Sequence, residues 1–94
     1  MAWRIVRQPN GYYARFSEIV DDFTVYDMTR AEAIVCCRRE QGMGKLESGP
    51  KLRRADSNPK WFEEAMGIIK FYHGAKTAAT RRRQLTRLKR RREN

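Results

Sequence analysis

The chain has 94 residues, of which 40% are hydrophobic, and its formal net charge is +10. This hydrophobic fraction excludes complete disorder, and the length predicts one small domain with a modest core. No apolar run approaches the roughly 20 residues that span a bilayer, and the first residues are too polar for a secretion signal. We therefore predict a cytoplasmic protein with no membrane partner.

The positive charge is concentrated towards the C-terminus. Residues 1–74 carry twelve Lys and Arg against ten Asp and Glu, whereas residues 75–94 carry nine against one. We predict one small domain over residues 1–74, followed by an arginine-rich tail over 75–94 that is either disordered or helical. Such an asymmetry favours a polyanionic partner, with nucleic acid ahead of an acidic protein or a membrane surface.

Three segments near the N-terminus have the pattern of β-strands. Apolar and polar residues alternate over 2–8, 12–18 and 22–27, as expected for strands with one buried face. Between the first two strands, Asn10-Gly11 is a strong signal for a tight hairpin in which both central residues have positive φ. The sequence therefore predicts a three-stranded antiparallel meander.

Two helices are predicted after the strands. Thr29 and Glu32 match a capping box, which starts a helix over 29–41. An Asn-Pro pair opens a second helix over 58–73. The segment between them, 42–57, contains three glycines and a proline and predicts a linker. The expected fold class is α+β, with the sheet packed against two helices and followed by a basic C-terminal extension.

Eight basic residues of the tail are predicted to bind nucleic acid. On a helix they would surround the axis rather than line one face, which suits an RNA groove or a phosphate backbone contacted without sequence preference. Most are Arg, whose planar fork matches phosphate. The alternative is a solvated, disordered run of charge. The eight residues are Arg81, Arg82, Arg83, Arg87, Lys89, Arg90, Arg91 and Arg92.

A second set of residues is predicted to form a partner surface. Exposed Tyr, Phe and Arg side chains on strands and helices are typical of surfaces that contact proteins or stacked bases. The alternative is a sheet covered on both faces, which would bury the strand residues. The set, which includes two arginines of the predicted linker, is Tyr13, Arg15, Tyr26, Arg53, Arg54 and Phe71.

No catalytic, metal-binding or cofactor-binding site is predicted. The single histidine, His73, has no Ser or Cys at a recognisable catalytic spacing. The adjacent Cys36 and Cys37 are interpreted as reduced core thiols. Acidic residues near the strand ends are interpreted as a polar turn or as a patch that contacts a basic protein, in preference to a Mg²⁺ site. These acidic residues are Glu18, Asp21, Asp22 and Asp27.

Residues 11–34, GYYARFSEIVDDFTVYDMTRAEAI, resemble the start of the HicB-like antitoxin domain. That family has an aromatic strand ending in Ala-x-Phe, a short turn, a further strand and a helix that opens with Glu-Ala. The resemblance implies a β-β-β-α scaffold that binds other molecules without catalysis. The matching positions are Tyr12, Ala14, Phe16, Thr24, Thr29, Glu32 and Ala33.

The composition, the tail and the lack of a catalytic constellation predict a non-enzymatic binding protein that engages nucleic acid or a nucleoprotein complex. Short chains of this kind resemble accessory proteins of phages and mobile elements, including inhibitors of the anti-CRISPR type and small regulators. The alternative is a HicB-like, antitoxin-type module, in which the sheet and the first helix meet a protein target.

Overall fold

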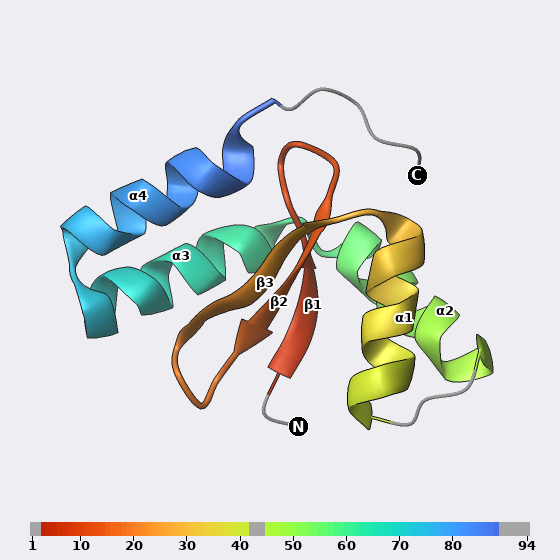
Figure 1. Ribbon diagram of the computed structural model, residues 1–94. Coiled ribbons are helices and arrows are strands. Elements are labelled where there is room, and N and C mark those ends of the chain that lie inside the picture. Colours follow the sequence, from red (N-terminus) through yellow and green to blue (C-terminus); the bar gives the residue numbers. More distant parts are fainter. Residues whose placement is uncertain (1–2, 42–44, 89–94) are drawn as a thin grey trace.

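The computed structural model of the chain describes residues 3–41 and 45–88 (Figure 1). Over these residues the chain forms an antiparallel sheet and four helices, so the predicted α+β class is confirmed. None of the described helices is long and apolar enough to cross a membrane. The elements in chain order are β1 (Trp3–Arg7), β2 (Tyr13–Ser17), β3 (Asp22–Met28), α1 (Arg30–Gln41), α2 (Lys45–Ser57), α3 (Lys60–His73) and α4 (Ala75–Thr86).

The three strands form the predicted meander, in the order β1-β2-β3. The register places Val6 opposite Ala14 and Phe16 opposite Phe23. Because side chains alternate between the faces of a strand, these four residues lie on one face of the sheet, and Ile5 lies on the other. The rings of Phe16 and Phe23 contact each other edge to face, with centroids 5.4 Å apart.

The β1–β2 turn differs from the expected two-residue hairpin. The Gly11 N–H donates to the backbone oxygen of Gln8 at 3.0 Å, and Gly11 has a φ of 92°. Asn10 lacks the positive φ that the two-residue turn requires. Pro9 explains the difference, because its fixed φ suits the first central position of a type I turn. Gly11 then supplies the left-handed residue that closes a three-residue loop.

Pairs of helices cover both faces of the sheet, so the molecule has three layers (Figure 1). On one face, α3 and α4 enclose a core that includes Phe16, Phe62 and Leu85. On the opposite face, α1 and α2 enclose a second core that includes Ile5 and Leu52. The structure therefore has the alternative arrangement considered above, in which the sheet is covered on both sides.

The helix α1 begins with the predicted capping box. The Glu32 N–H donates to Thr29 Oγ1 at 3.2 Å, and the Thr29 N–H donates to Glu32 Oε1 at 2.8 Å. These reciprocal bonds satisfy two backbone donors that have no partner within the helix. One turn further on, Ala33 and Cys37 are fully buried in the second core. The cap therefore fixes the start of the helix and the face that it buries.

The apolar residues of α3 are only partly buried. Tyr72, near the C-terminal end of the helix, is 63% exposed. The ring of Phe62 instead stacks on Phe23, with centroids 6.2 Å apart. Since α4 packs along α3, the buried side of α3 must serve both the sheet and this second helix. The buried residues of α3 are Phe62, Ala65, Met66 and Ile69.

The predicted linker over 42–57 is wrong where the structure describes it, because α2 occupies most of this range. Gly49 and Pro50 lower helix propensity, and Pro50 removes one backbone donor from the helix interior. Leu52 and Ala55 are nevertheless fully buried in the core beneath α1 and α2. Burial of this apolar surface outweighs the local preference for a turn.

The predicted boundary after residue 74 is also wrong, because the folded domain continues through α4. This segment is helical, one of its two predicted states, but it belongs to the core. Leu85 is fully buried, and Gln8 Nε2 donates to its backbone oxygen at 3.0 Å. Asn10 Nδ2 donates to the backbone oxygen of Arg87 at 3.1 Å. The β1–β2 turn therefore holds the C-terminal end of α4.

Asp56 ties α2 to the sheet and to α1. Arg7 Nη1 and the Tyr13 hydroxyl donate to Asp56 Oδ1 at 2.6 and 2.8 Å, and Arg30 Nη1 donates to Oδ2 at 3.3 Å. Burial acts to raise the pKa of Asp56, but the hydrogen bonds from Arg7 and Tyr13 and the charges of the two arginines outweigh it. The pKa of Asp56 is therefore held below its ordinary value.

We expect Asp56→Asn to lower the free energy of unfolding by about 1 kcal/mol near neutral pH, a value reduced for solvent exposure. Because the pKa is lower in the folded state, the carboxylate's contribution is fully present above the unfolded-state pKa. It is lost as the pH falls through the folded-state pKa. Urea unfolding of both proteins across this pH range measures the difference. A difference that stays constant into strong acid would contradict the prediction.

Candidate nucleic-acid interface

Two of the predicted nucleic-acid-binding arginines are held by carboxylates. Arg81 Nε and Nη2 donate to Asp22 Oδ1 and Oδ2, each at 3.0 Å, and these hydrogen bonds raise the pKa of Arg81. Arg82 Nη1 and Nη2 donate to the two carboxylate oxygens of Glu63 at 2.8 and 2.7 Å, and these bonds lower the pKa of Glu63. The two bidentate pairs fasten α4 to β3 and to α3.

The remaining basic residues near α4 form one exposed stripe. Lys76, Arg83 and Arg87 are all exposed, and in the part of the chain that the structure describes no carboxylate pairs with them. Their spacings of seven and eleven residues place them within about 40° of one another around the helix axis. We call these three residues the α4 stripe. Arg81 and Arg82 lie on other sides of the helix, where carboxylates hold them, so among the described residues the unpaired cations of α4 are confined to this stripe.

Lys76 was not among the predicted residues, whereas Arg81 and Arg82, which were, are bound by carboxylates. The sequence did contain a signal for Lys76. It lies seven residues before Arg83, and residues seven positions apart lie on the same face of a helix. The signal for the two ion pairs was absent, since Asp22 lies 59 residues from Arg81 in the chain. Only the packing of α4 on the sheet brings such residues together.

Four of the predicted residues lie outside the described part of the chain, so their role stays a prediction. They follow closely on Arg87, whose φ of −63° and ψ of 128° end α4 in an extended conformation. Because the Asn10 side chain holds the backbone oxygen of Arg87, the position from which they continue is fixed beside the β1–β2 turn. These four residues are Lys89, Arg90, Arg91 and Arg92.

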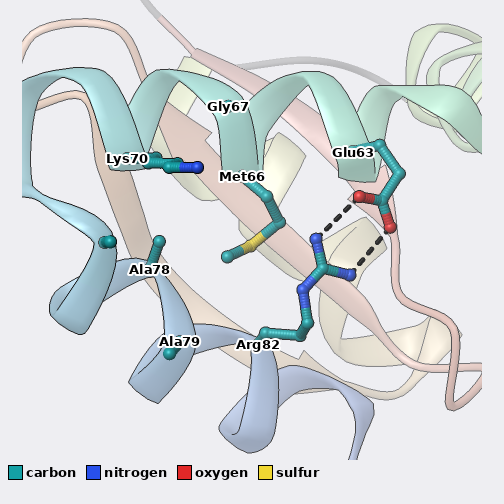
Figure 2. A pocket seen from close by; sticks show the side chains of 8 residues that line it. Glu63, Met66, Gly67, Lys70, Ala78, Ala79 and Arg82 are labelled. Carbon is teal, nitrogen blue, oxygen red and sulfur yellow. Dashed lines mark hydrogen bonds and ion pairs between the residues drawn. The ribbon is translucent and has the colours of Figure 1, made fainter.

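A groove of about 390 Å³ lies between α3 and α4 (Figure 2). Figure 2 shows Arg82 reaching from α4 to Glu63 on α3, while Lys70 extends from α3 elsewhere along the groove. Among the described residues no carboxylate pairs with Lys70, so it adds a further cation beside α4. The lining residues are Glu63, Met66, Gly67, Lys70, Ala75, Ala78, Ala79 and Arg82.

The predicted partner surface does not exist as one surface. Tyr13 is only 3% exposed, so its assignment is wrong; its hydroxyl belongs to the Asp56 network. Arg15 is half-buried and lies over the ring of Trp3, with its guanidinium carbon 5.5 Å from the ring centroid. The other four are exposed but lie on three different elements, β3, α2 and α3; they are Tyr26, Arg53, Arg54 and Phe71.

The described residues contain no group of three or more His, Cys, Asp or Glu side chains that could hold a metal ion. His73 Nε2 lies 2.9 Å from the backbone oxygen of Val20 and so joins α3 to the β2–β3 turn. Burial raises the pKa of the Cys37 thiol, which disfavours the reactive thiolate. The chemistry that the geometry offers most clearly is the binding of anions by exposed cations.

Residues 11–34 form β2, β3 and the start of α1. Strands followed by a capped helix occur in many folds, so this order does not test the resemblance to the HicB-like domain, which stays a prediction. No protein-family model matches the chain, and no match to it is found among the curated proteins or among the solved structures.

Proposed function

We propose that this protein is a non-enzymatic binding protein that contacts the phosphate backbone of nucleic acid through the α4 stripe and the basic residues that follow it. The observation that carries the proposal is the separation of roles on α4. Arg81 and Arg82 hold the helix in place, while Lys76, Arg83 and Arg87 face solvent together. A cationic row that no carboxylate of the described fold neutralises is suited to a polyanion.

The rigidity of α4 gives the stripe a defined geometry. From Lys76 to Arg87, the residue that follows α4, the helical rise is roughly 16 Å, which is long enough to face several phosphates of one strand. Leu85 and the ion pair to Asp22 fix the rotation of the helix, so the cations need little reordering on binding. Lys70 lies beside α4 and can contact the same backbone. Such contacts position a strand without reading its bases.

The more specific predictions, of a phage or mobile-element accessory protein and of an antitoxin-like module, have less support. An accessory protein of a phage or mobile element, including an anti-CRISPR-type inhibitor, would need a specific target surface in addition to the stripe. The antitoxin-like alternative would use the sheet and α1, but helices cover both faces of the sheet. The backbone-binding function is therefore the one for which the exposed side chains provide most support.

The double substitution Arg83→Gln/Arg87→Gln is expected to weaken binding to a 20-base-pair DNA duplex and to an RNA hairpin by about tenfold at 100 mM salt. It should also reduce the steepness of the slope of log K against log salt concentration by about 1 to 2, because fewer phosphate contacts mean that fewer counterions are released on binding. Fluorescence anisotropy over a series of salt concentrations gives both values. Both substituted residues are exposed, so the fold is expected to remain intact.

The matched control is Arg38→Gln/Arg39→Gln on α1, which removes the same charge from two exposed residues on the other side of the sheet. We expect this pair to leave the salt slope almost unchanged. If both pairs reduce the slope equally, binding reflects net charge alone and the stripe has no special role. Equal affinity of all three proteins at every salt concentration would exclude the proposed function.

A further inference from the structure

Four large apolar side chains are exposed at the C-terminal end of α3 and in the β2–β3 turn. Ile19 is 78% exposed, Val20 49%, Phe71 77% and Tyr72 63%. The rings of Phe71 and Tyr72 contact each other edge to face, with centroids 4.8 Å apart. We call these four residues the α3-end patch. Contiguous exposed apolar surface marks interaction sites, whereas isolated apolar residues do not.

One contact and one shared cavity place the turn beside the end of the helix. His73 Nε2 lies 2.9 Å from the backbone oxygen of Val20, which joins the last residue of α3 to the turn. One turn earlier on the helix, Ile68 lines a small cavity together with Glu18, which precedes the apolar residues of the turn. Tyr72 follows Ile68 on the same side of α3. The patch is therefore one surface built from two segments.

Carboxylates lie along part of the edge of this patch, and Lys70, which precedes Phe71, lines the groove beside α4. Asp21 lies in the turn, and Glu64 lies seven residues before Phe71, on the same face of α3. Among the described residues neither Asp21 nor Glu64 pairs with a cation. Glu18 has only an exposed contact of 3.7 Å with Arg4. Asp21, Glu18 and Glu64 thus give the patch an acidic edge on a chain whose net charge is +10.

We propose that the α3-end patch docks a basic protein surface that presents apolar side chains between Lys or Arg residues. This inference concerns a different surface from the α4 stripe and does not depend on nucleic-acid binding. The aromatic and aliphatic side chains supply the apolar contact area at the centre. The carboxylates at the edge pair with the partner's cations and reject acidic surfaces.

The acidic edge decides between this partner and two others. Exposed aromatic rings also stack on bases, but the carboxylates at this site would repel the phosphates of a bound strand. A second copy of the chain that presented its own patch would bring two acidic edges together, which like-charge repulsion disfavours. A basic, apolar protein surface is the occupant that satisfies both the apolar centre and the negative edge.

The experiment uses a synthetic 14-residue helical peptide of Leu and Lys, added to the full-length protein and followed by shifts of its backbone amide signals in NMR. The expected shifts lie in residues 18–21 and 68–73. Phe71→Ser should weaken the affinity by about tenfold. Asp21→Asn/Glu64→Gln should weaken it severalfold, and Asn tolerates the φ of 52° at position 21. The control Val35→Ser, at an exposed apolar residue of α1, should change nothing.

Two companion titrations define the contrary outcomes. A Leu–Glu peptide of the same length should shift amides of the basic helices and leave the patch unchanged. The proposal is wrong if the Leu–Lys peptide shifts no amides, shifts amides elsewhere, or binds all three variants equally. It is also wrong if a single-stranded DNA oligonucleotide shifts the patch amides, since the surface would then bind bases. The patch and the α4 stripe are followed through different amide signals, so either proposal can fail alone.

Discussion

Removal of residues 75–94 is expected to unfold the protein, although this segment carries most of the excess positive charge. The truncation deletes α4 and with it Leu85, which is fully buried in the core beside α3. It also removes Arg81, the ion-pair partner of Asp22, and it exposes the apolar side of α3. Loss of one buried Leu side chain destabilises a protein by about 2–5 kcal/mol, and this truncation removes more than one such contact.

The matched control is a truncation after Leu88, which removes only the residues beyond α4. We expect its melting temperature to be close to that of the full chain, while the truncation after Gly74 should show no cooperative transition by circular dichroism. A folded 1–74 fragment with a sharp transition would contradict the role assigned to α4. The shorter truncation, and not the longer one, is therefore suited to separating the contribution of the terminal residues to binding from loss of the fold.

Replacement of Gln8 by Leu is expected to have the second largest effect, about 2–4 kcal/mol of unfolding free energy. Gln8 is only 2% exposed. Its Oε1 accepts from the Asp27 N–H at 2.7 Å, and its Nε2 donates to Asp27 Oδ1 at 2.8 Å and to the backbone oxygen of Leu85 at 3.0 Å. Leu fills similar space but takes hydrogen bonds away from buried groups on β3 and α4, and the desolvation of those groups remains.

Urea unfolding of the Gln8→Leu protein measures this loss. The same change at Gln84, a half-exposed residue of α4 whose Oε1 accepts one hydrogen bond from Arg81, is the control and should alter stability by less than about 1 kcal/mol. If the two substitutions have equal effects, the buried amide network does not hold the layers together in the way described. Asp27 has a φ of 58°, so its backbone conformation is expected to depend on the amide of Gln8.

The features that could be predicted from the sequence are those determined by near neighbours in the chain. The strands follow from the alternation of apolar and polar residues. The start of α1 follows from Thr29 and Glu32, which are three residues apart and bond to each other. Gly11 was correctly placed in a turn, but the type of turn also depended on Pro9. Local chemistry was therefore a sound guide to these elements.

The features that were missed depend on contacts distant in the chain. Gly49 and Pro50 disfavour a helix locally, and α2 forms because Leu52 and Ala55 reach a core shared with β1. Charge composition suggested a tail after residue 74, but α4 contains Leu85 at the position where the sheet and α3 need an apolar residue. Neither contact leaves a signal in a short window of sequence.

The exposure of the predicted basic residues was foreseen only in part. Arg83 and Arg87 are exposed as the hypothesis requires, whereas Arg81 and Arg82 bind carboxylates. Exposure of Phe71 was also predicted, as part of the partner surface, and the structure confirms that exposure. Tyr13 was assigned to an open sheet face, which α1 and α2 cover. Side-chain partners of charged residues are the part of a site that periodicity does not reveal.

The hydrogen bond between Gln8 and the backbone oxygen of Leu85 spans 77 positions of the chain, and it has a consequence for the order of folding during synthesis. The core beneath α1 and α2 uses residues no later than Ala55, so it can assemble while the rest of the chain is still being made. The core beneath α3 and α4 must wait for Leu85. Until then the part of the apolar side of α3 that α4 covers is exposed, and newly made chains are most prone to aggregate in that interval.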